Sequence, residues 1–372
     1  MSDKPIYVSR PSLPPLEEFV EEIRDMWETG MMTHQGPKHN RLQAELEKFL
    51  DTPHITLFAN GHLALELGLN AMKLEGEVIT TPFTFGSTTQ AILRNGLKPV
   101  YCDIREDDFT IDADKIESLI TDKTVAIVPV HVYGNICDVE KIEAIAKKHN
   151  LKVIYDGAHA FGEIYKGVNA ANFGDMTMFS FHATKVFNTV EGGCLSYADG
   201  EWTRLLEGLR QFGQIVKTDV TPYVGTNAKM TDMHAAMGLC NLVHFDEYIQ
   251  RRKMVAERYR ERLTGIEGIK LSVEQEDLVS NYAYFPVVFE EGKSGITRDM
   301  AMEALAKENI FVRKYFYPLC SDFEIILEMG IESDVPIAKY ISDRVVTLPC
   351  YSDLTVEDAD RICDVICNLY KK

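Results

Sequence analysis

One lysine stands where an amine could act as a nucleophile. Lys185 lies in FSFHATKVFNTVEGG (179–193), after a strand-like run and ahead of a glycine pair. Apolar surroundings favour the neutral form of a lysine amine, and the neutral amine attacks aldehydes. A lysine that follows a strand is more often a solvated surface residue, so Lys185 carries weight only together with other groups.

A carboxylate and a histidine follow another strand-like run. The segment KVIYD (152–156) ends in Asp156, and His159 comes three residues later in GAHAFG. A carboxylate at the end of a strand can keep a pyridine nitrogen protonated. A helix cap or a loop aspartate is the alternative interpretation of Asp156.

Two further segments offer a phosphate site and an aromatic face. In FANGHLAL (58–65), Gly61 and His62 lie between a strand and a helix, where backbone N–H groups can bind phosphate, and Ser180 adds a hydroxyl. A tight turn would also explain the glycine. Phe85, just beyond the strand-like EVITTPF (77–83), can stack on a pyridine ring or belong to the core. Amine, carboxylate, phosphate donors and ring face together predict one cofactor, pyridoxal 5'-phosphate (PLP).

The elements that position these groups alternate between strands and helices up to about residue 212. This alternation predicts an α/β fold with a mainly parallel sheet between helices, in which ligands gather at the carboxyl ends of the strands. The helix pattern is clear in DVEKIEAIAKKHN (138–150). The expected strands are 55–58, 77–83, 98–104, 124–132, 152–156, 175–181 and 193–197.

A different pattern begins near residue 230. A long helical stretch (230–263) is followed by a strand-like NYAYFPVVF (281–289) and a helix near 297–308, which predicts a smaller C-terminal α+β domain. We place the boundary where a helix is expected to cross it, with residues 1–245 as a large cofactor-binding domain that includes an N-terminal arm and residues 246–372 as the small domain.

The composition excludes several classes of protein. With 39 basic and 57 acidic residues among 372, the formal charge is −18, which disfavours nucleic acid and anionic membranes as partners. No apolar run reaches the roughly 18 residues of a membrane span, and the first residues lack a signal-peptide core, so we expect a cytoplasmic protein. Eight scattered cysteines without a CxxC pair indicate reduced thiols, with no metal site expected.

Nine motifs in order resemble the DegT/DnrJ/EryC1/StrS sugar aminotransferase family of fold-type I PLP enzymes. RPSLPPLEEF, SFHATK and NTVEGG are most similar to the branch that makes nucleotide-linked 4-amino-4,6-dideoxy sugars. The motifs are WETGMMTHQGP (27–37), NGHLAL, VITTPFTF, VPVHVYGN (128–135), YDGAHAFG, SFHATKVFNTVEGG, GTNAKMTDMHAAMGL (225–239), RKYFYPL (313–319) and SDRVVTLPCY (342–351).

The resemblance implies a role for each candidate residue. Lys185 would be the Schiff-base lysine, and the proton shuttle as well. The other expected cofactor contacts are Asp156 at the pyridine nitrogen, His159 at the ring hydroxyl, Phe85 stacked on the ring, Gly61, His62 and Ser180 at the phosphate, and Asn227 reaching that phosphate from the neighbouring subunit of a homodimer with shared active sites. Many relatives have threonine at the position of His62 and arginine at the position of Lys229, which leaves the side-chain contacts of both residues open.

The expected reaction moves an amino group from an amino acid, L-glutamate first of all, to a nucleotide-linked keto-6-deoxy sugar. The implied acceptor is dTDP-4-keto-6-deoxyglucose or a related 4-keto sugar, and the implied use is O-antigen, lipopolysaccharide or another glycan. Amination at carbon 3 and a PLP-binding regulator without turnover stay open as alternatives. A sugar dehydratase on the same fold is disfavoured, because such relatives have histidine at the position of Lys185.

Overall fold

A seven-stranded sheet forms the centre of the molecule in the computed structural model, which describes residues 4–33, 35–215 and 218–371. Its order is β2-β10-β9-β6-β5-β3-β4, and every neighbouring pair is parallel except the two that β10 makes. The mainly parallel sheet predicted from the sequence is therefore present. Its strands are β2 (His54–Phe58), β3 (Glu77–Thr80), β4 (Lys98–Tyr101), β5 (Thr124–Val128), β6 (Lys152–Asp156), β9 (Met176–Ser180) and β10 (Gly193–Tyr197).

Helices cover both faces of this sheet, which is why most residues of its strands are buried whichever face they point to. Along β6, Val153 and Tyr155 belong to the core under α2, α6 and α8, whereas Ile154 points to the core under α3, α4 and α7. The flanking helices are α1 (Leu16–Thr29), α2 (Pro37–Phe49), α3 (Gly61–Ala71), α4 (Gly86–Arg94), α5 (Ala113–Ile116), α6 (Val139–His149), α7 (Glu201–Leu209) and α8 (Asp232–Val243).

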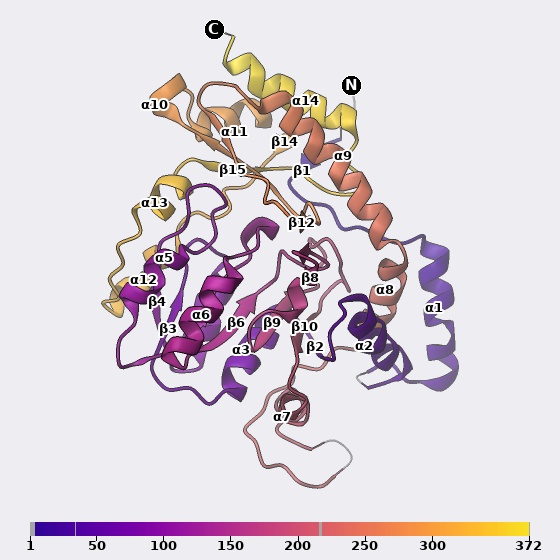
Figure 1. Cartoon of the computed structure of the whole chain (residues 1–372). Helices are drawn as coiled ribbons and strands as arrows, with labels where there is room; N and C mark the ends of the chain where they lie inside the picture. The colour runs from indigo at the N-terminus through magenta and orange to yellow at the C-terminus, as the bar shows by residue number, and fades with distance from the viewer. Residues whose placement is uncertain (1–3, 34, 216–217, 372) are drawn as a thin grey trace.

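The C-terminal part forms a second layer with its own core. An antiparallel sheet, β11-β13-β15, packs against α9, α11 and α14, and these elements lie above the large sheet in Figure 1, at the same end as both termini. The helices and strands of the whole C-terminal part, including α12 and α13 beside the large sheet, are α9 (Phe245–Leu263), β11 (Ile269–Leu271), β13 (Phe285–Phe289), α10 (Glu291–Ser294), α11 (Arg298–Lys307), α12 (Glu324–Glu328), α13 (Pro336–Ser342), β15 (Val345–Leu348) and α14 (Val356–Leu369).

Two small sheets join parts of the chain that are far apart in sequence. The order β12-β7-β8 ties the C-terminal part to the loop after β6, and β1 pairs with β14 in parallel. The strands are β1 (Ile6–Tyr7), β7 (Ile164–Tyr165), β8 (Val168–Asn169), β12 (Leu278–Val279) and β14 (Ile310–Phe311). The domain division at about residue 245 stays a prediction.

Two expected elements differ in extent. The helical stretch 230–263 is broken, because the N–H of His244 bonds to the carbonyl of Asn241, three residues back, and ends α8 before α9 begins. The expected strand 281–289 starts only at Phe285, since Tyr282 has a positive φ of 51° and turns the chain. The sequence also extends β3, β4, β5 and β9 beyond their observed ends at Thr80, Tyr101, Val128 and Ser180.

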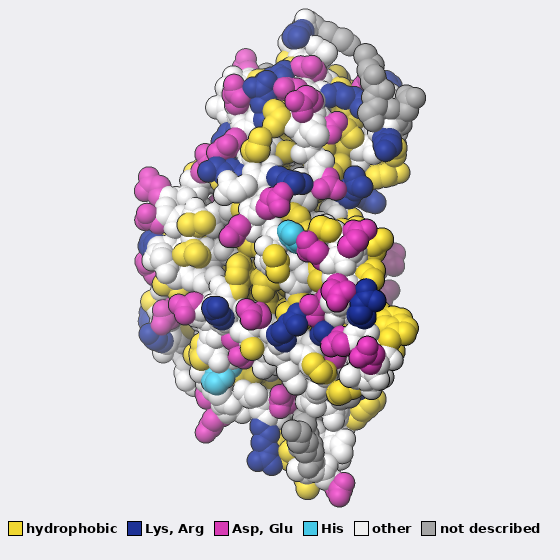
Figure 2. Space-filling model, turned by 90° about the vertical axis from the view of Figure 1, so that its right-hand side faces the viewer, with side chains coloured by type: hydrophobic (Ala, Val, Ile, Leu, Met, Phe, Trp, Pro, Cys, Tyr) yellow, Lys and Arg dark blue, Asp and Glu magenta, His cyan; other side chains and the backbone are white. Residues whose placement is uncertain are grey.

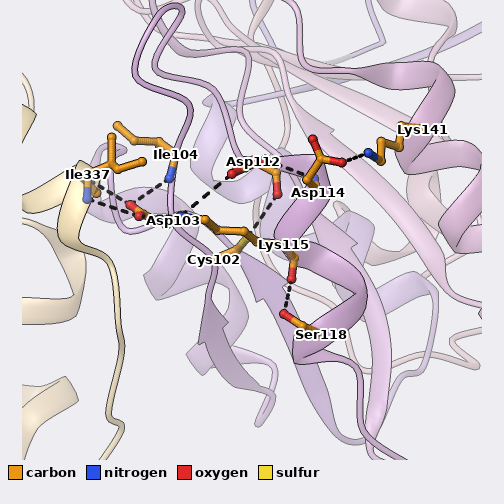
Figure 3. Close-up of polar contacts among 10 residues, drawn as sticks. Cys102, Asp103, Ile104, Asp112, Asp114, Lys115, Ser118, Lys141 and Ile337 are labelled. Carbon is orange, nitrogen blue, oxygen red and sulfur yellow. Dashed lines mark hydrogen bonds and ion pairs between the residues drawn. The ribbon is translucent and has the colours of Figure 1, made fainter.

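A buried carboxylate fastens the C-terminal part to the edge of the large sheet. Asp103 follows β4 and is 1% exposed. Its Oδ1 accepts a hydrogen bond from the N–H of Ala338 at 2.8 Å. Its Oδ2 accepts one from the N–H of Ile337 at 3.2 Å, and Figure 3 shows Asp103 facing Ile337. Lys115 Nζ lies 3.0 Å from Oδ2. Asp103 thus caps α13 from a distant part of the chain, where the helix N-terminus favours negative charge.

Candidate active site

Seven of the eight predicted residues line one cavity of about 330 Å³. It lies where β6 and β9 end and where α3 and α4 begin. The seven are Gly61, His62, Phe85, Asp156, His159, Ser180 and Lys185. The cavity is therefore at the carboxyl ends of parallel strands, as expected for an open α/β sheet.

Asp156 is the last residue of β6 and is 4% exposed. Its Oδ2 accepts a hydrogen bond from Thr88 Oγ1 at 2.8 Å, and its Oδ1 accepts one from the N–H of Ala158 at 3.1 Å. Burial raises the pKa of this carboxyl, while the two hydrogen bonds and nearby Lys185 act in the opposite direction. A buried carboxylate without a cationic ion pair in the described residues is suited to a cationic partner inside the cavity.

His159 has a defined tautomer when it is neutral. Its Nδ1 accepts the N–H of Tyr133 at 3.0 Å, so the proton is on Nε2. Burial, aided by the positive charge of Lys185, holds the pKa of His159 well below its usual value. Asn281 holds the loop that carries His159, because its Nδ2 donates to the backbone carbonyl of His159 at 2.9 Å. His159 therefore offers one N–H donor.

Lys185 lies on the loop between β9 and β10 and is partly buried. Its Nζ is 3.4 Å from the hydroxyl of Tyr284 and 5.7 Å from the centre of that ring. The ring of Tyr284 in turn contacts the ring of His159, with 4.5 Å between centroids. The C-terminal part of the chain thus supplies a hydroxyl beside the candidate amine.

The start of α3 has the features of a phosphate site. Asn60 caps the helix through Leu63, and the first N–H groups of a helix have no acceptor within it. A Cβ on Gly61 would meet Ser180 Cβ at 2.8 Å, so only glycine permits this approach of helix and strand. The side chain of His62 contacts α4, with its Nδ1 2.9 Å from Ser87 Oγ.

Phe85 precedes α4 and remains 67% exposed although it lines the cavity. A large apolar ring that the described residues leave so open is suited to stacking on a planar ligand. Its carbonyl also accepts the N–H of Thr88, which places Thr88 one turn further on and aims its hydroxyl at Asp156.

Asn227 does not line this cavity. It is exposed, and its side chain accepts a hydrogen bond from Lys229, which lies over the ring of Phe212 at 4.4 Å. The adjacent carbonyl of Ala228 accepts the N–H of Ala59, so the loop is anchored close to the start of α3. The side chain of Asn227 therefore lies outside the cavity of its own chain, and its predicted phosphate contact is not made within this chain.

Sequence reasoning missed several residues in the cavity wall and one behind it. Thr88 does not line the cavity but donates to Asp156, and it could have been found because it stands three residues after Phe85 on α4. Tyr284 had no such signal, since its segment was interpreted as part of a strand. Missed lining residues also include Thr84, His182, Glu191, Tyr315 and Phe316.

No metal-binding cluster of histidine, cysteine and acidic residues exists within the described residues, and the cysteines there are all free. No described helix is long and apolar enough to cross a membrane.

Comparison with known proteins decides the family. Residues 16–367 match the sequence model of the DegT/DnrJ/EryC1/StrS aminotransferase family. The chain belongs to this family. A dTDP-4-amino-4,6-dideoxy-D-glucose transaminase of Shigella dysenteriae is 41% identical over 364 residues, which are 98% of this chain and 99% of that protein.

Solved structures agree with the family and confirm the fold class. DesI, in the presence of its TDP-sugar product, matches with a TM-score of 0.94 and 31% identity over 100% of this chain and 94% of that one. Spr1654 from Streptococcus pneumoniae, in its PLP form, has a TM-score of 0.91 and 27% identity over 99% of both chains. The protein is thus an aminotransferase with the fold-type I architecture predicted from its motifs.

Proposed function

We propose that this aminotransferase uses PLP to transfer an amino group from L-glutamate to dTDP-4-keto-6-deoxyglucose or a related nucleotide-linked 4-keto sugar. The observation that carries the proposal is the meeting of Lys185, Asp156, His159 and Phe85 around one cavity. The 41% identity to a transaminase named for a dTDP-4-amino sugar supports the acceptor. A soluble enzyme of the cytoplasm that feeds O-antigen, lipopolysaccharide or other glycan synthesis is the setting that we infer.

Four features of the cavity fit the cofactor. Asp156 is a buried carboxylate that makes no ion pair among the described residues and so suits a protonated ring nitrogen. Phe85 lines the cavity and is 67% exposed, and the cavity reaches Gly61 at the start of α3, where helix N–H groups can bind a phosphate. Lys185 brings the amine into the same space. When bound, PLP withdraws electrons from the carbon that carries the amino group.

Each residue has a separate task in this proposal. Lys185 would hold the cofactor through its amine and, once that amine is free, would move the proton between the donor's α-carbon and the cofactor. Asp156 keeps the ring nitrogen protonated, because a buried negative charge stabilises a cation beside it. His159 donates its Nε2 proton to the ring oxygen. The N–H groups at the start of α3 and Ser180 bind the phosphate.

We also propose a homodimer in which Asn227 completes the partner's phosphate site. Asn227 is exposed and outside its own cavity. The helix α1 leaves Leu16, Val20 and Trp27 between 43% and 68% exposed, and Figure 2 shows hydrophobic side chains at the surface of the face that carries this helix. Exposed apolar surface of this kind is typical of an interface between proteins.

The function is tested with the purified protein and PLP. Absorbance near 410–430 nm is expected on cofactor binding, and it should fall on addition of L-glutamate and return with the keto sugar. Mass and NMR assignment of the product from a panel of nucleotide-linked keto sugars then identifies the carbon that is aminated. A stable band that glutamate leaves unchanged would favour a regulator over an enzyme.

The shared site is tested by mixing variants. Lys185→Ala and Asn227→Ala proteins, each impaired alone, are brought under conditions that exchange subunits. Heterodimers with one intact site should then regain activity, because Lys185 of one chain meets Asn227 of the other. Absence of recovery despite proven exchange would refute the shared site.

A further inference from the structure

The N-terminal arm, residues 4–15, joins the C-terminal part of the chain to the large sheet. Ile6 of β1 pairs with β14 and is 6% exposed in the core of the C-terminal part. Figure 1 shows the chain leaving β1 among the C-terminal elements and reaching α1, which packs on α8. Pro11, Pro14 and Pro15 fix the φ angles of the stretch in between. The prolines therefore limit how far this connection can bend.

Ser12 contacts both parts of the molecule at once and is 1% exposed. Its Oγ lies 2.8 Å from the Oγ of Ser352, which follows β15 in the C-terminal part. Its backbone carbonyl accepts a hydrogen bond from Asn188 Nδ2 at 2.9 Å. Asn188 stands three residues after Lys185 in the loop between β9 and β10, residues 181–192, which we call the Lys185 loop. One buried residue of the arm thus connects the C-terminal part with this loop.

Asn188 determines the course of the Lys185 loop. It is 1% exposed, its Oδ1 accepts the N–H of Val190 at 3.2 Å, and its carbonyl accepts Nδ2 of Asn241 on α8 at 2.9 Å. Val190 has a φ of 68°, which a β-branched residue adopts only where its surroundings impose it. A shift of Asn188 would displace Lys185 on one side and Glu191 on the other, and both of these residues line the cavity.

We propose that the N-terminal arm positions Lys185 for the cofactor, with Ser12 and Asn188 as positioning residues. Neither residue lines the cavity, so both act through the Lys185 loop. The C-terminal part supplies Tyr284 and Phe316 to the cavity wall, and the arm fixes the amine relative to that wall. Coupling between two sites is reciprocal, so cofactor binding should in turn stabilise the arm. This inference deepens the proposed function and rests on it for the identity of the cofactor.

The first test uses cofactor-free protein and amide hydrogen exchange measured by mass spectrometry. Asn188→Ala should speed exchange in residues 181–192 by roughly tenfold, because the buried hydrogen bonds to the arm and to the turn are lost. Ser12→Ala and Ser352→Ala remove one hydroxyl contact from its two sides. Each should speed exchange in the same residues by about threefold, and the double variant should exceed neither single variant.

The second test adds PLP. In the wild type, PLP should slow exchange in residues 6–13 of the arm as well as in the Lys185 loop. In Asn188→Ala the arm should no longer respond to PLP, although the 410–430 nm band still forms. The band should form about tenfold more slowly in this variant, because the amine is no longer held in place before it meets the cofactor.

Matched controls separate this positioning role from a general loss of stability. Asn169→Ala removes a buried side chain whose Oδ1 accepts the N–H of Ala171 at 3.0 Å. Ser196→Ala removes a buried hydroxyl that donates to the carbonyl of Ala171 at 2.8 Å. Neither residue lines the cavity or contacts the arm. Both variants should melt at a lower temperature and keep the wild-type exchange of the Lys185 loop and the wild-type rate of band formation.

Two results would overturn the inference. One is an Asn188→Ala protein whose loop exchange and band formation stay within about twofold of the wild type. The other is an arm that responds to PLP equally in the wild type and in Asn188→Ala. If Asn188→Ala does not fold, Ser12→Ala decides by the same two measurements. A protein that shows this coupling but never aminates a keto sugar would refute the proposed reaction and leave the positioning role in place.

Discussion

Replacing Asp156 by asparagine isolates the charge of one buried side chain. The amide has nearly the same size as the carboxyl group, and its oxygen can still accept a hydrogen bond from Thr88 or from Ala158. The change therefore preserves the shape of the cavity and removes the negative charge that we assign to the ring nitrogen.

The expected loss of activity follows from that single interaction. A hydrogen bond to a charged group contributes at most roughly 3 kcal/mol, and about 1.4 kcal/mol corresponds to a factor of ten. The half-reaction with L-glutamate should therefore slow by about 100-fold while PLP still binds through Lys185 and the phosphate contacts.

The same change should stabilise the cofactor-free protein. Burial raises the folded-state pKa of Asp156, so the stability linked to this group is present below the pKa of the unfolded chain and is lost as pH rises through the folded value. Above the folded-state pKa, the ionised carboxylate is buried without an ion pair to a described residue. Cofactor-free Asp156→Asn should then melt at a higher temperature than cofactor-free wild type, and the difference should shrink toward acidic pH.

Stopped-flow absorbance measures the half-reaction, and differential scanning calorimetry measures the melting temperature. Asp103→Asn is the matched control, because Asp103 is also a buried carboxylate but lies outside the cavity. It should lower the melting temperature and keep the rate of the half-reaction. An Asp156→Asn enzyme that reacts at the wild-type rate would refute the role assigned to this residue.

Three other substitutions test the amine, the α13 contact and the missed tyrosine. Lys185→Ala should abolish both the 410–430 nm band and transamination with an unchanged circular dichroism spectrum; wild-type turnover would contradict its role as base. Asp103→Ala should lower the free energy of unfolding in urea by about 3 kcal/mol, because the N–H groups of Ile337 and Ala338 lose a buried acceptor; a change below about 0.5 kcal/mol would show that water replaces it. Tyr284→Phe should keep the band and slow the glutamate half-reaction about tenfold, since the hydroxyl beside Lys185 Nζ is lost; an unchanged rate and pH profile would leave Tyr284 a purely structural residue.

The sequence predicted the parts of the site that depend on local order along the chain. Gly61, Asp156 and Ser180 each stand at or just after the end of a strand, and the ends of parallel strands meet at one edge of a sheet. Phe85 directly precedes a helix at the same edge. Knowing the strands was therefore enough to bring these residues together, even though the exact strand ends were overestimated at β3, β4 and β5.

Contacts between segments that are far apart in the chain leave no recognisable pattern in the sequence. Tyr284 reaches Lys185 across 99 positions, and Asp103 reaches Ala338 across 235. Neither contact follows from periodicity, because each depends on how the C-terminal part packs on the large sheet. A phenol and a carboxylate gain their roles there only through the register of β13 and the position of α13.

The same packing separates two parts of the surface around the site. The cavity with Lys185 takes most of its wall from turns of the large sheet, whereas a neighbouring pocket of about 910 Å³ takes half of its wall from the segment 312–318 and α11. That segment packs on the large sheet through the core that contains Phe83, Phe316 and Val345, close to the contact between Asp103 and α13. Loss of the α13 contact should therefore disturb the neighbouring pocket before it disturbs the cavity, so Asp103→Ala should lower stability and keep the 410–430 nm band.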